Sequence, residues 1–152
     1  MTKKNTRSVA VLTCNQDDVE LVNSCISHET CGTSCLWISN PKQFVDALLK
    51  ETIEIIVLNM DEYESTVRQV VKLKDTFISE VPVIVVSKKA DEQSIVKILE
   101  GGASDLVSIK RKARLRVVLN RELRALRVEK ALNTTLISAT EYRRQLHDYI
   151  EN

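Results

Sequence analysis

Glycine, proline and aromatic residues are scarce in this chain of 152 residues, which has three Gly, two Pro and 4% Phe, Trp and Tyr. So few turn-forming residues argue against a many-turned all-β fold, while 43% apolar and 28% charged residues argue against disorder. Long apolar runs are missing as well, and the first residues contain no signal-peptide core. We therefore expect one ordinary domain with an appendage, located in the cytoplasm and without a membrane span.

Spacings typical of metal sites are also missing. The four cysteines form no C-x-x-C pair, and His28 and His147 lie in unrelated segments. The cytoplasm keeps thiols reduced. We expect no bound metal or other cofactor, and free thiols at all four cysteines: Cys14, Cys25, Cys31 and Cys35.

What the chain does have is five short apolar segments rich in β-branched residues, which predict strands. Segments with helical apolar spacing follow them. Asn15 can cap the first helix, with Asp17 and Asp18 favouring its dipole, and Pro41 suits the first turn of the second. Parallel strands need crossover connections, so the alternation predicts a doubly wound, five-stranded parallel sheet. The predicted strands are 8–13, 35–39, 54–59, 81–87 and 104–109.

Residues 111 to about 150 contain neither Gly nor Pro and predict an extended C-terminal helix, either continuous or nearly so. Its first turns can pack on the sheet, but a globule of this size cannot cover its whole length. An exposed apolar stripe is normally covered by a partner, so we expect a homodimer. The predicted interface comprises Leu115, Leu119, Leu123, Leu126, Leu132, Leu136, Leu146 and Ile150.

The net charge of +1 hides an uneven distribution. Nine Lys or Arg against two Glu give residues 110–130 a charge of +7, whereas residues 1–109 carry −5 and residues 131–152 carry −1. Cations in a first helical turn oppose the helix dipole, so they do not serve local stability. The basic segment is expected to be a solvated face or a contact for an acidic protein surface; nucleic acid is disfavoured, since no aromatic or Gly-rich features accompany the charges.

Four motifs in order resemble the receiver domain of two-component response regulators, over residues 7–127. VAVLTCNQDDVELV stands where that family has a strand, acidic residues and a helix, and EIIVLN where a strand ends in the phosphoaccepting Asp. VPVIVVS stands where a strand ends in Ser or Thr, and GGASDLVSIK where a Gly-Ala-x-Asp turn precedes a strand and a Lys. The resemblance implies the receiver or flavodoxin-like strand order 2-1-3-4-5.

The same resemblance implies that the phosphorylation site is degenerate. The magnesium-binding acidic pair falls on Thr13 and Cys14, the phosphoacceptor on Asn59, and the conserved Lys on Ile109, leaving only Ser87 of the usual set. An amide is neither nucleophile nor anion, and a hydroxyl and a thiol do not restore the charge that Mg²⁺ prefers. We expect a pseudo-receiver without catalytic activity.

Several of these residues also have ordinary structural interpretations. Asn59 can simply hydrogen-bond the loop after its strand, and Asp61 is expected in a solvated acidic loop rather than as a displaced metal ligand. Cys14 is expected to be a small buried thiol rather than a redox sensor. Trp37, the one Trp, is expected in core or strand packing.

The turn GASDLVS followed by NRELRAL is most similar to the amino-terminal receiver of FimX-like cyclic-di-GMP effectors, which act in type IV pilus assembly and twitching motility. This resemblance implies a receiver-like domain over residues 1–127 and a helical linker over 128–152 to PAS, GGDEF or EAL domains or to another signalling protein. Two alternatives remain open: a conventional phosphorelay switch, and a nucleic-acid-binding adaptor that uses the basic helix.

Overall fold

The computed structural model describes residues 7–26, 33–63, 65–78 and 80–151. Cys31 and His28 lie outside this part of the chain. Strands and helices alternate along its length. In chain order they are β1 (Arg7–Leu12), α1 (Gln16–Ile26), β2 (Thr33–Ile38), α2 (Pro41–Lys50), β3 (Thr52–Asn59), α3 (Val67–Phe77), β4 (Val83–Ser87), α4 (Glu92–Glu100), β5 (Asp105–Ser108) and α5 (Lys112–Glu151).

The five strands form one sheet in the order β2-β1-β3-β4-β5, and all four pairings are parallel. The predicted doubly wound fold and its strand order are therefore confirmed. Each predicted strand lies within two residues of the observed one at both ends.

Side-chain caps define where the middle helices begin. Asn40 Oδ1 accepts from the Gln43 backbone N–H at 2.9 Å, directly before Pro41 in the first turn of α2. Thr66 and Gln69 form a capping box on α3. Asp91 Oδ1 accepts from Ser94 N–H at 2.8 Å at the start of α4. Hydrogen bonds from the Ser94 side chain and then from its backbone N–H lower the pKa of Asp91.

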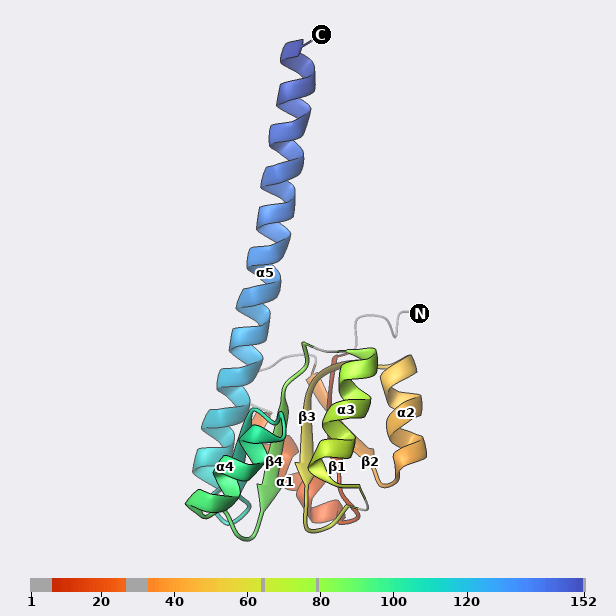
Figure 1. Cartoon of the computed structure of the whole chain (residues 1–152), viewed down its shortest axis with the longest axis vertical. Helices are drawn as coiled ribbons and strands as arrows, with labels where there is room; N and C mark the ends of the chain where they lie inside the picture. The colour runs from red at the N-terminus through yellow and green to blue at the C-terminus, as the bar shows by residue number, and fades with distance from the viewer. Residues whose placement is uncertain (1–6, 27–32, 64, 79, 152) are drawn as a thin grey trace. The chain divides into compact units, whose positions relative to one another are not determined.

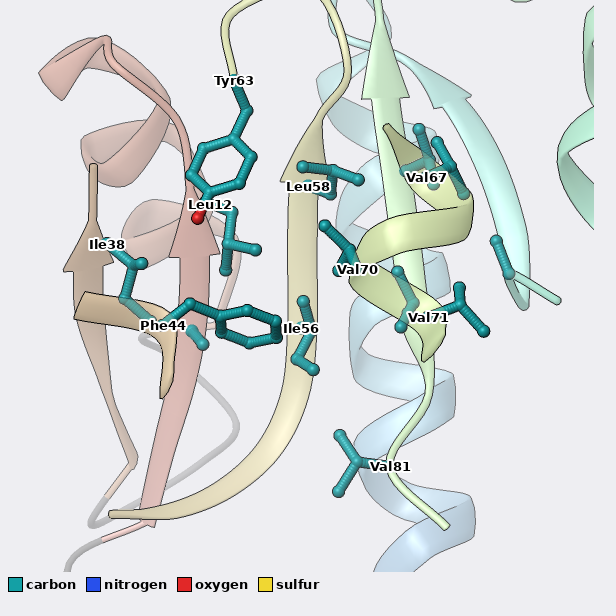
Figure 2. Packing of buried hydrophobic residues seen from close by; sticks show 14 of the residues in the cluster. Leu12, Ile38, Phe44, Ile56, Leu58, Tyr63, Val67, Val70, Val71 and Val81 are labelled. Carbon is teal, nitrogen blue, oxygen red and sulfur yellow. The ribbon is translucent and has the colours of Figure 1, made fainter. Parts of the chain in front are cut away.

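The core lies on both faces of the sheet, because successive strand residues point to opposite sides. Helices α2, α3 and α4 cover the face turned toward the viewer in Figure 1. Figure 2 shows the Phe44 ring of α2 extending toward Ile56 of β3, with Tyr63 above Leu12. On the other face, α1 meets the first turns of α5, where Asn120 Nδ2 donates to the Cys25 carbonyl at 3.2 Å.

The chain divides into two compact units, residues 1–122 and 123–152, and helix α5 runs through both as one element of 40 residues. The predicted long helix is thus continuous. The division predicted at residue 127 stays a prediction. Within the described residues no helix is both long and apolar enough to cross a membrane.

Burial separates the predicted interface residues into two groups. Leu115 and Leu119 are fully buried, and Leu123 and Leu126 are 1% and 6% exposed; their role between copies stays a prediction. The remaining apolar residues of the helix differ. Leu132 and Leu136 are 57% and 62% exposed, while the side chains of Leu146 and Ile150 lie outside the described part.

Candidate functional site

Three polar residues meet at the carboxyl edge of the sheet. Thr13 directly follows β1, Asn59 ends β3 and Ser87 ends β4, and these strands are neighbours in the sheet. All three are buried, with at most 4% of their surface exposed. This is the edge at which doubly wound sheets carry their ligand sites. The structure therefore brings together three of the five residues predicted for the degenerate phosphorylation site.

A buried carboxylate from α1 links two of them. Asp18 Oδ2 accepts from the Thr13 hydroxyl and from Asn59 Nδ2, both at 2.6 Å, and Asp18 is only 5% exposed. Asp18 lies in the first turn of α1, as the sequence predicts, and its side chain also turns inward to the sheet edge, which the sequence did not show. Thr13 Oγ1 also accepts from Asn15 N–H at 3.1 Å. The buried polar groups at this edge thus hold one another in place.

A second set of bonds surrounds Ser87. The Ser87 hydroxyl lies 3.1 Å from both carboxylate oxygens of Asp61, and Asp61 Oδ2 also accepts from Lys88 N–H at 2.9 Å. Asn59 Oδ1 accepts from Asp61 N–H at 3.0 Å, as predicted for an amide that orders the following loop. Asp61 is exposed, yet its carboxylate is engaged by β4 rather than simply solvated. The two sets of bonds form one network through Asn59.

Two residues at the mouth of the site were predicted differently. Cys14 is exposed, so the prediction of a buried thiol there is wrong; its main anchor is the backbone N–H, which donates to the Glu62 carbonyl at 3.0 Å. Trp37 is 43% exposed and not part of the core. Its indole Nε1 donates to the Thr13 carbonyl at 2.8 Å, which fixes the ring beside the site.

The fifth predicted residue lies outside this network. Ile109 follows β5 and is half-buried, and its backbone N–H donates to the Ser87 carbonyl at 2.9 Å. Lys110 is exposed. In the described part of the chain, no Lys or Arg side chain bonds to Asp18, Asn59, Asp61 or Ser87. An anion held at this edge would therefore meet no fixed cation.

The described residues offer no cluster of three or more His, Cys, Asp or Glu side chains that could hold a metal ion. Cys14, Cys25 and Cys35 are free thiols there. Burial raises the pKa of Cys25, and raises that of Cys35 to about 12, where the nearby Cys25 adds a smaller contribution. Both thiols therefore stay protonated at neutral pH.

Cations gather in two neighbouring segments at the same edge. Lys88 and Lys89 follow β4, and Lys110, Arg111 and Lys112, the last at the start of α5, follow β5, whose pairing with β4 brings the two segments together. These five side chains are exposed, and no ion pair of theirs occurs among the described residues. By contrast, Arg114 and Arg121 pair with Asp105 at 3.4 and 4.0 Å. The edge is thus acidic over β1 and β3 and basic over β4 and β5.

No protein-family model matches the chain, and no curated protein matches it. Solved structures do. The receiver domain of a Francisella response regulator aligns with a TM-score of 0.65 and 13% identity, over 78% of this chain and 97% of that one. A response regulator from Thermotoga maritima aligns with a TM-score of 0.66 and 19% identity, over 78% and 98%.

NtrX from Brucella abortus aligns with a TM-score of 0.68 and 17% identity, over 83% of this chain but 29% of that chain. This chain therefore matches a minor part of a longer protein in that case and nearly the whole of the shorter ones. The shared feature is the parallel sheet in the order 2-1-3-4-5 with helices on both faces. The chain has the fold of response-regulator receiver domains.

Proposed function

We propose that the chain is a receiver-like signalling module that is not switched by phosphorylation and acts through its contacts with other proteins. The observation that carries this proposal is Asn59. It stands at the end of β3, where the resembled family holds its phosphoaccepting Asp, and its amide is committed to Asp18 and to the Asp61 backbone.

The surrounding residues support the same conclusion. Phosphoryl transfer needs a nucleophile, a metal ion and fixed positive charge at the transferred group. An amide supplies no nucleophile, and the Asp18 oxygen nearest the site already accepts two short hydrogen bonds. The position of the conserved Lys is held by the apolar Ile109. The site is built to keep one conformation rather than to change with a phosphoryl group.

Acetyl phosphate with Mg²⁺ tests this directly. Intact-mass measurement should show no phosphoryl adduct on the chain. Asn59→Asp should also remain unmodified, because one carboxylate restores neither the metal ligands at Thr13 and Cys14 nor the cation at Ile109. A stable adduct on any Asp of the unaltered chain would show a working phosphorelay switch, which is the alternative function.

The module's contact is proposed to be a second copy of the chain. Every described side chain from residue 131 to 145 is exposed, including four large apolar ones: Leu132, Leu136, Ile137 and Tyr142. Apolar surface of this kind is normally covered in a symmetric dimer. Light scattering at tens of micromolar should give twice the chain mass, and Leu132→Gln should lower it. If the unaltered chain has the mass of a monomer at tens of micromolar, the proposal is wrong.

A finer proposal is that the module couples to cyclic-di-GMP signalling in the manner of FimX-like effectors. Its support is the GASDLVS and NRELRAL resemblance, together with a helix that continues well past the domain. The gene's reading frame tests it: continuation into PAS, GGDEF or EAL domains is expected. A frame or operon without any such domain contradicts it.

The exposed cations that follow β4 and β5 leave one alternative to be tested, a nucleic-acid-binding adaptor. Binding of this kind weakens steeply with salt, because phosphate contacts release counterions. We expect an electrophoretic shift assay to show no retained complex at physiological salt. A complex with useful affinity there would make the adaptor the better assignment.

A further inference from the structure

The second half of helix α5 carries a charge-free apolar seam that no part of the described chain covers. We propose that this segment pairs with the same segment of a second copy as an antiparallel coiled coil. The inference rests on the self-association proposed above and adds the seam, the direction and the register of the contact.

The seam follows the alternating four- and three-residue spacing of a coiled coil. Starting at Val128, each step of four and three residues meets an uncharged side chain up to the end of the helix. Three large members of the seam are more than half exposed: Val128 at 54%, Leu132 at 57% and Tyr142 at 64%. By position the seam consists of Val128, Leu132, Thr135, Ala139, Tyr142, Leu146 and Tyr149.

A neighbouring stripe has the same spacing but contains a charge. It passes through Leu132, Leu136 and Ala139 and then meets Arg143. A guanidinium in the centre of a helix pair would be desolvated without a partner, which is costly. In the charge-free seam Arg143 lies at the flank instead, where an arginine can reach water or an acidic side chain.

The hydroxyl of Thr135, in the middle of the seam, is already bonded within the helix. Thr135 Oγ1 donates to the Ala131 carbonyl at 2.9 Å. Its methyl group can therefore enter a helix interface without leaving the buried hydroxyl without an acceptor. Tyr142 likewise suits such a position, because its ring can lie in the seam while its hydroxyl reaches the rim.

The charges at the flanks favour the antiparallel direction. Glu129, Leu136 and Arg143 are seven residues apart and occupy one flank of the seam. Flanking positions set the orientation of a coiled coil through interhelical ion pairs. In the antiparallel arrangement centred near residue 137, Glu129 faces the partner's Arg143, Leu136 faces the partner's Leu136, and the two-fold axis repeats the ion pair.

The same arrangement matches side-chain sizes across the seam. Leu132 faces the partner's Tyr142, and Thr135 faces the partner's Ala139, so large layers flank small ones. In a parallel pair, Glu129 would lie beside the partner's Arg124 and Arg143 beside the partner's Ser138, so only one of the two charges would have an opposite neighbour. Neither Glu129 nor Arg143 makes an ion pair within its own chain in the part that the structure describes, so both are available.

Charge reversal tests the direction on the full chain. Glu129→Arg or Arg143→Glu replaces two attractions by two repulsions, and each should raise the dimer dissociation constant on the order of ten-fold. The double variant exchanges the charges and should return to within about three-fold of the unaltered chain. Arg144→Glu makes the same charge change on the outer face and is the matched control, with an expected effect under about two-fold.

Sedimentation equilibrium at low salt measures these constants, and a cysteine experiment checks the register in a Cys14→Ser background. Leu132→Cys chains mixed with Tyr142→Cys chains should form a mixed disulfide, whereas Leu132→Cys chains alone should not link to each other.

Each outcome has a separate meaning. Weakening by both single variants without rescue by the double variant, or self-linking of Leu132→Cys chains, overturns the antiparallel direction and leaves the dimer standing. A dimer insensitive to every charge variant places the contact elsewhere and overturns the seam. A chain that is monomeric without any substitution contradicts the self-association proposal itself.

Discussion

Replacing Asp18 with Ala should reveal how strongly the site network stabilises the fold. Asp18 is buried and accepts two hydrogen bonds of 2.6 Å, from Thr13 and Asn59. A hydrogen bond to a charged acceptor contributes about 1.5 to 3 kcal/mol, and the substitution would leave both donors buried without an acceptor. The gain in helix propensity, about 0.5 kcal/mol, offsets a small part of this loss. We expect the free energy of unfolding to fall by about 3 kcal/mol.

Urea unfolding followed by Trp37 fluorescence measures this change, because Trp37 is the single Trp and its indole bonds to Thr13. With a urea slope of about 2 kcal/mol per molar, the midpoint should fall by roughly 1.5 M. Asp17→Ala, in the same turn but exposed, is the control and should cost under about 1 kcal/mol.

In the Asp18→Ala variant the Thr13 hydroxyl has no acceptor, and this allows a second, sharper measurement. Thr13→Val should destabilise the unaltered chain but stabilise the Asp18→Ala variant by about 1 kcal/mol, because it removes a hydroxyl that has lost its acceptor. The Asn15 N–H, which also loses its Thr13 acceptor, belongs to an exposed residue and can bond to water instead. If Asp18→Ala costs no more than Asp17→Ala, or if Thr13→Val is destabilising in both backgrounds, the account of a buried, mutually satisfied network is wrong.

Two more predictions concern other parts of the domain. Gly102→Ala should lower the free energy of unfolding by about 2 kcal/mol in chemical denaturation, because Gly102 has φ +103° and a Cβ would lie 2.8 Å from Val71 Cγ1. Gly101→Ala, at φ −75°, is the control and should cost under about 1 kcal/mol. Equal costs for the two substitutions would contradict the reasoning. At pH 8 an alkylating reagent should modify exposed Cys14 in minutes and Cys35 only after unfolding, because burial raises the pKa of Cys35 to about 12. Peptide mapping identifies the modified thiols. Rapid modification of both cysteines in the folded chain would contradict the burial of Cys35.

Much of the fold followed from local patterns. Apolar, β-branched segments mark strands buried on both faces, and Asn15 and Pro41 mark helix starts where the structure has them. The start of β4 was placed two residues early because Val81 is apolar and buried, although the strand pairing begins only at Val83. The apolar pattern of the sequence indicates burial at Val81, whereas the hydrogen bonds between neighbouring strands define where β4 begins.

The site was predicted in part. The ends of three neighbouring strands locate Thr13, Asn59 and Ser87 from sequence alone, since parallel strands finish at one edge. Asp18 was missed because its position in a first helical turn has a sufficient local explanation in the helix dipole. Cys14 was misplaced for a related reason: the chain leaves the sheet after Thr13, and strand alternation gives no guide once the strand has ended.

The amino-acid sequence by itself determined the alternation of strands and helices, the parallel sheet and the long charged helix, and it placed an amide at the end of the third strand. These properties depend on the order and chemical type of neighbouring residues. Only the tertiary structure decided that Asp18 turns inward to join Thr13 and Asn59, that Leu115 and Leu119 are covered within the chain, and that Leu132 and Tyr142 are not. The physical reason is that the sequence shows where a helix is apolar, whereas burial depends on which other elements of the folded chain pack against it.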